Sequence, residues 1–175
     1  ISVNRWEPAN VLAALRTGLI DAVQVVYNIF DQAPEDELFP ACERQGVAIM
    51  GFNRPEWFWA DLGAIHAGAV PAGIYTTTTP DNVRYIAHHC EAAVAVVENQ
   101  QQLELFTRLR PQLPQLRAIV VMQGGRTQAD VYAWEDFLRL GEQVPESSVE
   151  ERVALQQPDD LCTLIYTSGT TGAPK

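Results

Sequence analysis

The residues of this chain best suited to chemistry are its last ten, which read Tyr-Thr-Ser-Gly-Thr-Thr-Gly-Ala-Pro-Lys at positions 166–175. Glycine lets a backbone approach an anion closely, and successive backbone N–H groups can then form an anion-binding nest. Four Ser and Thr hydroxyl groups add hydrogen-bond donors, and Lys175 adds a positive charge. The loop is therefore suited to closing around a chain of phosphates. The alternative, an ordinary turn rich in Gly, Ser and Thr, explains the full pattern less well.

The elements that must position this loop form an alternating pattern. Short β-rich runs alternate with helical stretches, which predicts an α/β fold with a parallel sheet and helices on both faces. The strand candidates are near-continuous apolar runs, as expected for strands covered on both faces. They are Ala22–Tyr27, Val47–Met50, Val70–Thr76, Ala93–Val97, Ala118–Met122 and Leu161–Tyr166. The predicted helices are Pro8–Thr17, Pro34–Gln45, Pro55–Ala67, Pro80–Cys90, Gln101–Arg110 and Tyr132–Leu140.

Proline and glycine mark the boundaries of these elements. Several helices open with proline in the first turn, and Gly18, Gly46 and Gly68 follow helical stretches. The polar stretch Gly141–Gln157 is predicted to form a surface connection before the last strand. If the chain carries only part of such a sheet, the unpaired edges of that part predict self-association.

Other candidate residues favour structural roles. Adjacent side chains on a helix point about 100° apart, so His88 and His89 cannot chelate one metal ion together. We expect both histidines to lie at the end of a helix, where the helix dipole favours them. The hydroxyl run at 76–79 is expected to supply an N-cap at Thr79 rather than a ligand contact. The aromatic residues 57–59 are expected to pack in the core rather than to contact an acyl chain or lipid. No catalytic residue and no metal ligand is assigned.

The composition limits the classes of function. The 175 residues carry a formal charge of −10 and 47% of them are hydrophobic, which predicts a globular chain and argues against nucleic acid as the main partner. The longest apolar stretch, Leu62–Tyr75, is interrupted by His66 and Pro71 and falls short of the roughly 20 residues of a transmembrane helix. The three cysteines are far apart and odd in number, and no signal peptide is evident, so we expect a cytoplasmic location.

The terminal loop resembles the signature of the AMP-forming acyl/adenylate synthetase superfamily, with every fixed position present and Ala173 in the variable one. The segments 51–58, 60–68 and 72–77 resemble long-chain acyl-CoA synthetases, especially the bubblegum-type branch. This resemblance covers 47–175. It implies a ligase that uses ATP with Mg²⁺, a fatty acid and coenzyme A (CoA) as small-molecule substrates, and proceeds through an acyl-adenylate. The residues that would hold the ATP phosphates are Thr167, Ser168, Gly169, Thr170, Thr171, Gly172 and Lys175.

The beginning of the chain resembles a different family, the bacterial aldo/keto reductases. The segments 1–8, 18–28 and 31–42 would supply a helix, a barrel strand and the next helix of that family's β/α barrel. By this resemblance, Asn4 and Gln24 would lie where the nicotinamide carboxamide of NADPH is held.

Together, the two resemblances predict a chimera or a truncated fragment. Residues 1–46 would form a barrel-derived helix–strand–helix piece, and residues 47–175 an incomplete Rossmann-like sheet. The alternatives are a single diverged synthetase, a fragment of an NADPH-linked reductase, and a chimera without enzymatic activity. In the synthetase family, the adenine-, ribose- and magnesium-binding residues and a catalytic lysine follow the loop. We therefore expect no acyl-adenylate formation by this chain alone.

Overall fold

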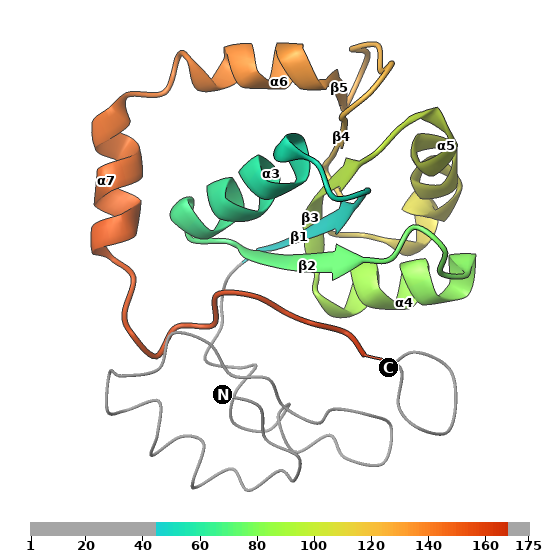
Figure 1. The fold of residues 1–175 in the computed structure, drawn as a ribbon, viewed down its shortest axis with the longest axis horizontal. Helices are drawn as coiled ribbons and strands as arrows, with labels where there is room; N and C mark the ends of the chain where they lie inside the picture. Colours follow the sequence, from blue (N-terminus) through green and yellow to red (C-terminus); the bar gives the residue numbers. More distant parts are fainter. Residues whose placement is uncertain (1–44, 168–175) are drawn as a thin grey trace, which may run out of the picture.

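The computed structural model describes residues 45–167, which form a parallel sheet packed against helices (Figure 1). The strands are β1 (Gly46–Met50), β2 (Val70–Ile74), β3 (Ala92–Val97), β4 (Ala118–Val121) and β5 (Val131–Ala133). The helices are α3 (Pro55–His66), α4 (Pro80–His89), α5 (Gln100–Leu109), the short 3₁₀ helix η1 (Arg110–Gln112), α6 (Trp134–Gly141) and α7 (Glu146–Ala154). The predicted α/β class with a parallel sheet is confirmed.

The strand order creates a change of direction between β1 and β3. The order across the sheet is β2-β1-β3-β4-β5, and every neighbouring pair is parallel. Helix α3 connects β1 to β2, whereas α4 carries the chain back past β1 to β3. In open parallel sheets, ligands bind in the crevice that such a reversal leaves outside the carboxyl ends of the strands. The topology therefore directs attention to the ends of β1 and β3.

The larger part of the core lies between the sheet and helices α4 and α5. Alternate strand residues such as Ala48 and Val97 meet Val83, Ile86 and Phe106 from the helices. Burying a large apolar side chain fully contributes about 1.5–3 kcal/mol. A smaller core on the opposite face joins Ile49, Val96 and Val120 to side chains of α3 and α6. The predicted helices on both faces of the sheet are thus confirmed.

The aromatic residues 57–59 do not all pack in the core, so that prediction is wrong for two of them. Phe58 and Trp59 are each 58% exposed, whereas Trp57 packs against the smaller core. Three consecutive helical positions point in directions about 100° apart, so they cannot all face the sheet. Trp59 instead stacks on Trp134 of α6, with ring centroids 6.4 Å apart.

The predicted element boundaries hold over most of the sheet. The strands β1 to β4 each lie within two residues of their predicted bounds. Helices α3 and α4 begin at the predicted prolines, and Thr79 accepts a hydrogen bond from the Asn82 N–H at 3.4 Å, which confirms the predicted N-cap. Gly68 follows α3 with φ of 77°, the left-handed conformation that glycine adopts readily at helix ends.

Two elements differ from the prediction. The helix predicted over Tyr132–Leu140 begins only at Trp134, because Val131–Ala133 pairs with β4 as a fifth strand. Valine and tyrosine favour a strand once a partner is available. The stretch Gly141–Gln157 is more than a connection, since it contains α7. A proline directly before that helix, a glutamate in its first turn and an arginine in its last turn are helix signals.

Several predicted elements cannot be compared. The segments Pro8–Thr17 and Ala22–Tyr27 lie outside the described residues, as does nearly all of Pro34–Gln45 and with it the barrel-derived piece. Within residues 45–167, no helix is both long enough and apolar enough to cross a membrane.

Candidate functional site

The segment that leads into the loop motif runs along the outer edge of β2. Leu164 pairs in parallel with Ala72, and its N–H donates to the Pro71 carbonyl at 2.9 Å. The Thr163 hydroxyl donates to the same carbonyl at 3.2 Å. Because the pairing is parallel, the chain heads toward the carboxyl ends of the strands, where phosphate sites of such sheets lie. Of the strand predicted over Leu161–Tyr166, this single bridge is present.

Only one of the predicted phosphate-binding residues lies within the described part of the chain. Thr167 is exposed and follows the buried Tyr166. The other residues of the predicted sites lie outside the described residues, and their roles remain predictions. They are Ser168, Gly169, Thr170, Thr171, Gly172 and Lys175, together with the nicotinamide candidates Asn4 and Gln24.

Tyr166, the first residue of the motif, is fixed against the end of α4. Its hydroxyl lies 2.6 Å from Nδ1 of His89, at hydrogen-bonding distance. Tyr85, one helical turn earlier, stacks on His89 with centroids 5.5 Å apart and meets Tyr166 edge-on at 6.4 Å. His88 and His89 both lie in the last turn of α4, which confirms their predicted helix-terminal position. The contact between His89 and the motif was not predicted.

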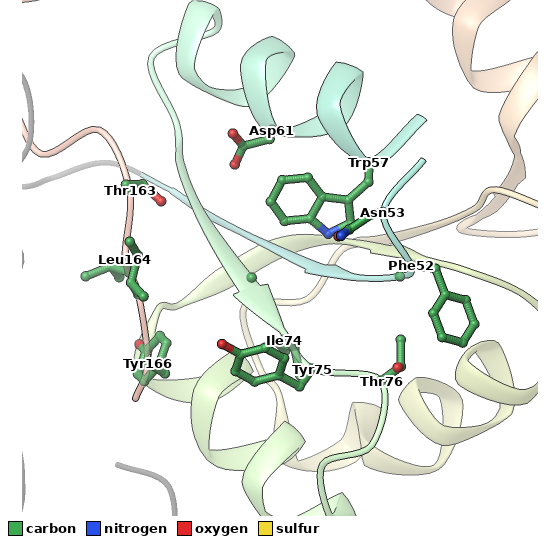
Figure 2. Close-up of a pocket in the computed structure, with 13 residues that line it drawn as sticks. Phe52, Asn53, Trp57, Asp61, Ile74, Tyr75, Thr76, Thr163, Leu164 and Tyr166 are labelled. Carbon is green, nitrogen blue, oxygen red and sulfur yellow. The ribbon is translucent and has the colours of Figure 1, made fainter. Parts of the chain in front are cut away.

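A cleft of about 780 Å³ opens beside this segment, at the carboxyl ends of β1 and β2 (Figure 2). Figure 2 shows Trp57 and Asp61 of α3 on one side and the segment with Thr163, Leu164 and Tyr166 on another. Tyr75, at the end of β2, is 75% exposed at the mouth. A concave site with mostly apolar walls and a few polar groups is the usual form of a small-molecule site.

Asp61 supplies a carboxylate to the wall of the cleft. Burial raises the pKa of this group above its ordinary value of 3.8. A raised pKa means that the folded chain holds the charged form less favourably than the unfolded chain does. The cleft is therefore better suited to a ligand that donates hydrogen bonds or carries positive charge at this point than to a second carboxylate.

Replacing Asp61 with asparagine is expected to stabilise the chain at neutral pH. Because the pKa of Asp61 is higher in the folded state, the contribution of Asp61 to the stability of the wild type falls as the pH rises above 3.8 and is constant above the folded-state pKa. The asparagine variant lacks this loss. Urea unfolding between pH 3 and pH 7 gives the free energy of unfolding of both proteins as a function of pH. The two curves should coincide at the acidic end, and the curve of the asparagine variant should lie increasingly above that of the wild type as the pH rises. A constant offset across the whole range would contradict the assignment.

A second group of polar residues closes the crevice between β1 and β3. Glu98, directly after β3, is 4% exposed, and its carboxylate accepts hydrogen bonds from the Phe52 N–H at 2.9 Å and from Nη1 of Arg54 at 2.7 Å. Arg54 also donates to both carboxylate oxygens of Glu56, at 2.7 and 2.8 Å. With its amide oxygen toward the guanidinium, Gln123 accepts from Arg54 at 2.7 Å.

This network fixes the charge states of its members. The hydrogen bonds to Glu56 and Glu98 raise the pKa of Arg54, and Arg54 in turn lowers the pKa of Glu56. Arg54 and Glu56 therefore remain charged at neutral pH. The network holds the backbone after β1, including Phe52 at the wall of the cleft, and so links the crevice to the site.

Neither Glu98 nor the role of Arg54 was predicted from the sequence. The available signal was an acidic residue placed directly after the wholly apolar strand Ala92–Val97, since a carboxylate at the buried end of a strand needs a partner. The partner itself could not be read from the sequence, because Arg54 lies 44 positions away.

The described residues offer no metal site, and one of their cysteines, Cys90, is buried. Between residues 45 and 167, no three His, Cys, Asp or Glu side chains come together in a way that could hold a metal ion. Burial raises the pKa of the Cys90 thiol to about 12, so this cysteine is a structural residue.

A family model of AMP-binding enzymes matches residues 42–175. The long-chain-fatty-acid–CoA ligase ACSBG2 of Xenopus laevis is 46% identical over 132 residues, which cover 74% of this chain and 18% of that protein. The corresponding ligase ACSBG1 is 47% identical in Rattus norvegicus, over the same shares of both chains, and 44% identical in Homo sapiens, over 76% of this chain and 19% of that protein. The chain thus spans about a fifth of the length of the curated relatives it matches.

Solved structures agree with this match. The anthranilate CoA ligase AuaEII, in complex with anthranoyl-AMP, has a TM-score of 0.54 and 27% identity, covering 75% of this chain and 24% of that chain. A red-emitting luciferase from Phrixothrix hirtus has a TM-score of 0.52 at 16% identity, covering 75% of this chain and 25% of that chain, and so supports the fold alone. The reductase resemblance of residues 1–46 has no counterpart in these matches and stays a prediction. The family match and the identity to these ligases show that the chain belongs to the AMP-binding enzyme family.

Proposed function

We propose that the protein is an ATP-dependent long-chain fatty acid–CoA ligase and that these 175 residues contribute its phosphate-binding loop. The observation that carries the proposal is the complete motif at 166–175, which begins where the chain reaches the carboxyl ends of a parallel sheet. The names of the relatives, which are long-chain-fatty-acid–CoA ligases, support the choice of substrates.

The proposed reaction has two balanced steps. A carboxylate oxygen of the fatty acid attacks the α-phosphorus of ATP, the bond from that phosphorus to the β-phosphate oxygen breaks, and pyrophosphate leaves. The CoA thiolate then attacks the acyl carbon, and AMP leaves as the thioester forms. Splitting the reaction in this way replaces a poor electrophile with a mixed anhydride.

The role of the loop in this reaction is electrostatic. The backbone N–H groups of 167–172 and the Ser and Thr hydroxyl groups would hold the β- and γ-phosphates, and Lys175 would neutralise charge that builds up on the departing pyrophosphate. These donors suit phosphate oxygens. Mg²⁺ would be held chiefly by those oxygens and would neutralise the same charge.

We also propose partners, a location and a domain division for the protein. Small molecules are the proposed partners, the cytoplasm is the proposed location, and unpaired strand edges are a proposed route to self-association. The division into 1–46 and 47–175 likewise remains a proposal; the family match begins at residue 42.

Lys175 makes the phosphate assignment directly testable, because it is the only lysine of the chain. An amine-reactive reagent therefore has two targets, the Lys175 side chain and the N-terminal amine, which serves as an internal control. At a MgATP concentration ten times the Kd, modification of Lys175 should slow about tenfold while that of the N-terminus is unchanged. Inorganic tripolyphosphate should protect as well, and adenosine should not. Equal rates at Lys175 with and without MgATP would contradict the assignment.

The ligase activity itself is tested on the gene product that contains these residues and the remainder of the family's length. Pyrophosphate release is expected when ATP, CoA and a long-chain acid are all present, above a blank without the acid. The 175-residue chain alone is expected to stay at the blank.

A further inference from the structure

We propose that His89 is a positioning residue for the phosphate loop, because it holds Tyr166 and so fixes the point where the loop leaves the sheet. The inference rests on the proposed function for the role of the loop. It assigns a new role to a residue of α4 that lies 77 positions before the tyrosine it contacts. His89 is a positioning residue, since it acts on the loop through Tyr166.

The geometry around Tyr166 carries the inference. The contacts that hold the loop segment include the backbone bridge from Leu164 to the edge of β2 and the side chain of Tyr166 on α4. Tyr166 is 8% exposed, whereas Ile165 before it is 64% exposed and Thr167 after it is also exposed. The side chain of Tyr166 is thus the last buried anchor before the residues predicted to bind phosphate.

The contact is specific in both its polar and its aromatic parts. The His89 and Tyr166 rings meet at 87° with centroids 5.6 Å apart, and the tyrosine hydroxyl lies within hydrogen-bonding distance of Nδ1. Tyr85 stacks on His89 at an angle of 26° and supports the imidazole from the preceding turn. A histidine placed at a helix end only for its charge would require neither contact.

A set of variants of the full 175-residue chain separates these parts. His89→Phe keeps a ring against Tyr85 but removes the hydrogen bond, whereas His89→Asn places a polar atom near the position of Nδ1. His88→Phe is the matched control, because His88 is exposed in the same helical turn. The first readout is hydrogen exchange at the Leu164 N–H, which donates to Pro71, with the Met122 N–H inside the sheet as reference.

Loss of one hydrogen bond should speed exchange at Leu164 about fivefold in His89→Phe and leave Met122 unchanged. Tyr166→Phe should do the same, and the double variant should add little, because both changes remove one interaction. The second readout is the affinity for inorganic tripolyphosphate, followed by the amide signals of the loop. His89→Phe should weaken it about fivefold, His89→Asn should restore it, and His88→Phe should leave it unchanged.

Two results would overturn the inference. Unchanged Leu164 exchange in His89→Phe would show that the contact anchors nothing, and faster exchange with unchanged tripolyphosphate affinity would reduce His89 to a structural residue. A wild-type chain that binds no tripolyphosphate would instead count against the proposed phosphate site. The anchoring by His89 would then still be decided by the exchange rate of Leu164.

Discussion

Replacing Glu98 with glutamine is expected to lower the free energy of unfolding by about 3 kcal/mol. The Glu98 carboxylate is 4% exposed and accepts hydrogen bonds from the Phe52 N–H and from Arg54, one on each oxygen. A glutamine amide has a single oxygen, so its NH₂ group must face one of these two donors. One donor of this partly buried network loses its acceptor, and Arg54 keeps only Glu56 as a charged partner on this side.

Urea unfolding, followed by tryptophan fluorescence, measures this effect. Glu104→Gln is the matched control: Glu104 is exposed on α5 and bonded to Gln100 within the same helix, so its loss should change stability by less than about 0.5 kcal/mol. In an Arg54→Met background, Glu98→Gln should cost clearly less, because the two residues interact directly. Equal stability of Glu98→Gln and Glu104→Gln would show that the network does not stabilise the fold.

This prediction also connects the fold to the site. The hydrogen bond from Phe52 to Glu98 fixes the backbone after β1, and Phe52 lines the cleft beside the loop segment. Buried charges at the end of a strand are costly unless every one is paired. The network therefore ties the shape of the cleft wall to the integrity of the crevice between β1 and β3.

The parts of the fold that could be predicted are those that local sequence determines. Strand β3 is an uninterrupted apolar run, and α3 and α4 open with proline, so pattern alone located them. Strand β5 has only three residues, and its state depends on pairing with β4, which no local pattern shows. The exposure of Phe58 and Trp59 was missed for a related reason, since composition indicates hydrophobicity but not the direction of a side chain on its helix.

In the candidate site too, the local features could be predicted from the sequence and the long-range contacts could not. The loop motif is contiguous, and its chemistry could be inferred from glycine, hydroxyl groups and Lys175 alone. The contacts that position it join distant residues: His89 to Tyr166, and Arg54 to Glu98. Because each of these pairs forms only when the sheet brings its partners together, neither could be predicted without the fold.

Replacing Gly46 with alanine is expected to destabilise the chain by at least about 3 kcal/mol, although the change adds a single methyl group. A Cβ atom at this position would lie 1.8 Å from the Cys90 carbonyl oxygen and 2.8 Å from its carbonyl carbon. Both are backbone atoms at the end of α4, so no rotation of a side chain can relieve the clash. Either β1 or the turn that joins α4 to β3 must move.

That turn has little freedom to move. Glu91 already adopts φ of 50° within it, and Gly46, at the start of β1, pairs with both Val70 and Ala92. From the sequence, Gly46 was expected to end a helix, whereas the structure requires it for the close approach of two backbones. The cost is therefore one of packing rather than of turn conformation.

The matched control for Gly46→Ala is the same substitution at Gly63, on the exposed side of α3, where nothing lies within 4 Å of a new Cβ. Gly63→Ala should stabilise the chain by about 0.5–1 kcal/mol, because alanine loses less backbone entropy in a helix. The same substitution is made in both variants, so urea midpoints that shift in opposite directions would show that the loss of stability in Gly46→Ala comes from the contact with Cys90. If Gly46→Ala were as stable as the wild type, β1 would not approach the end of α4 closely enough for a Cβ at Gly46 to meet the Cys90 carbonyl.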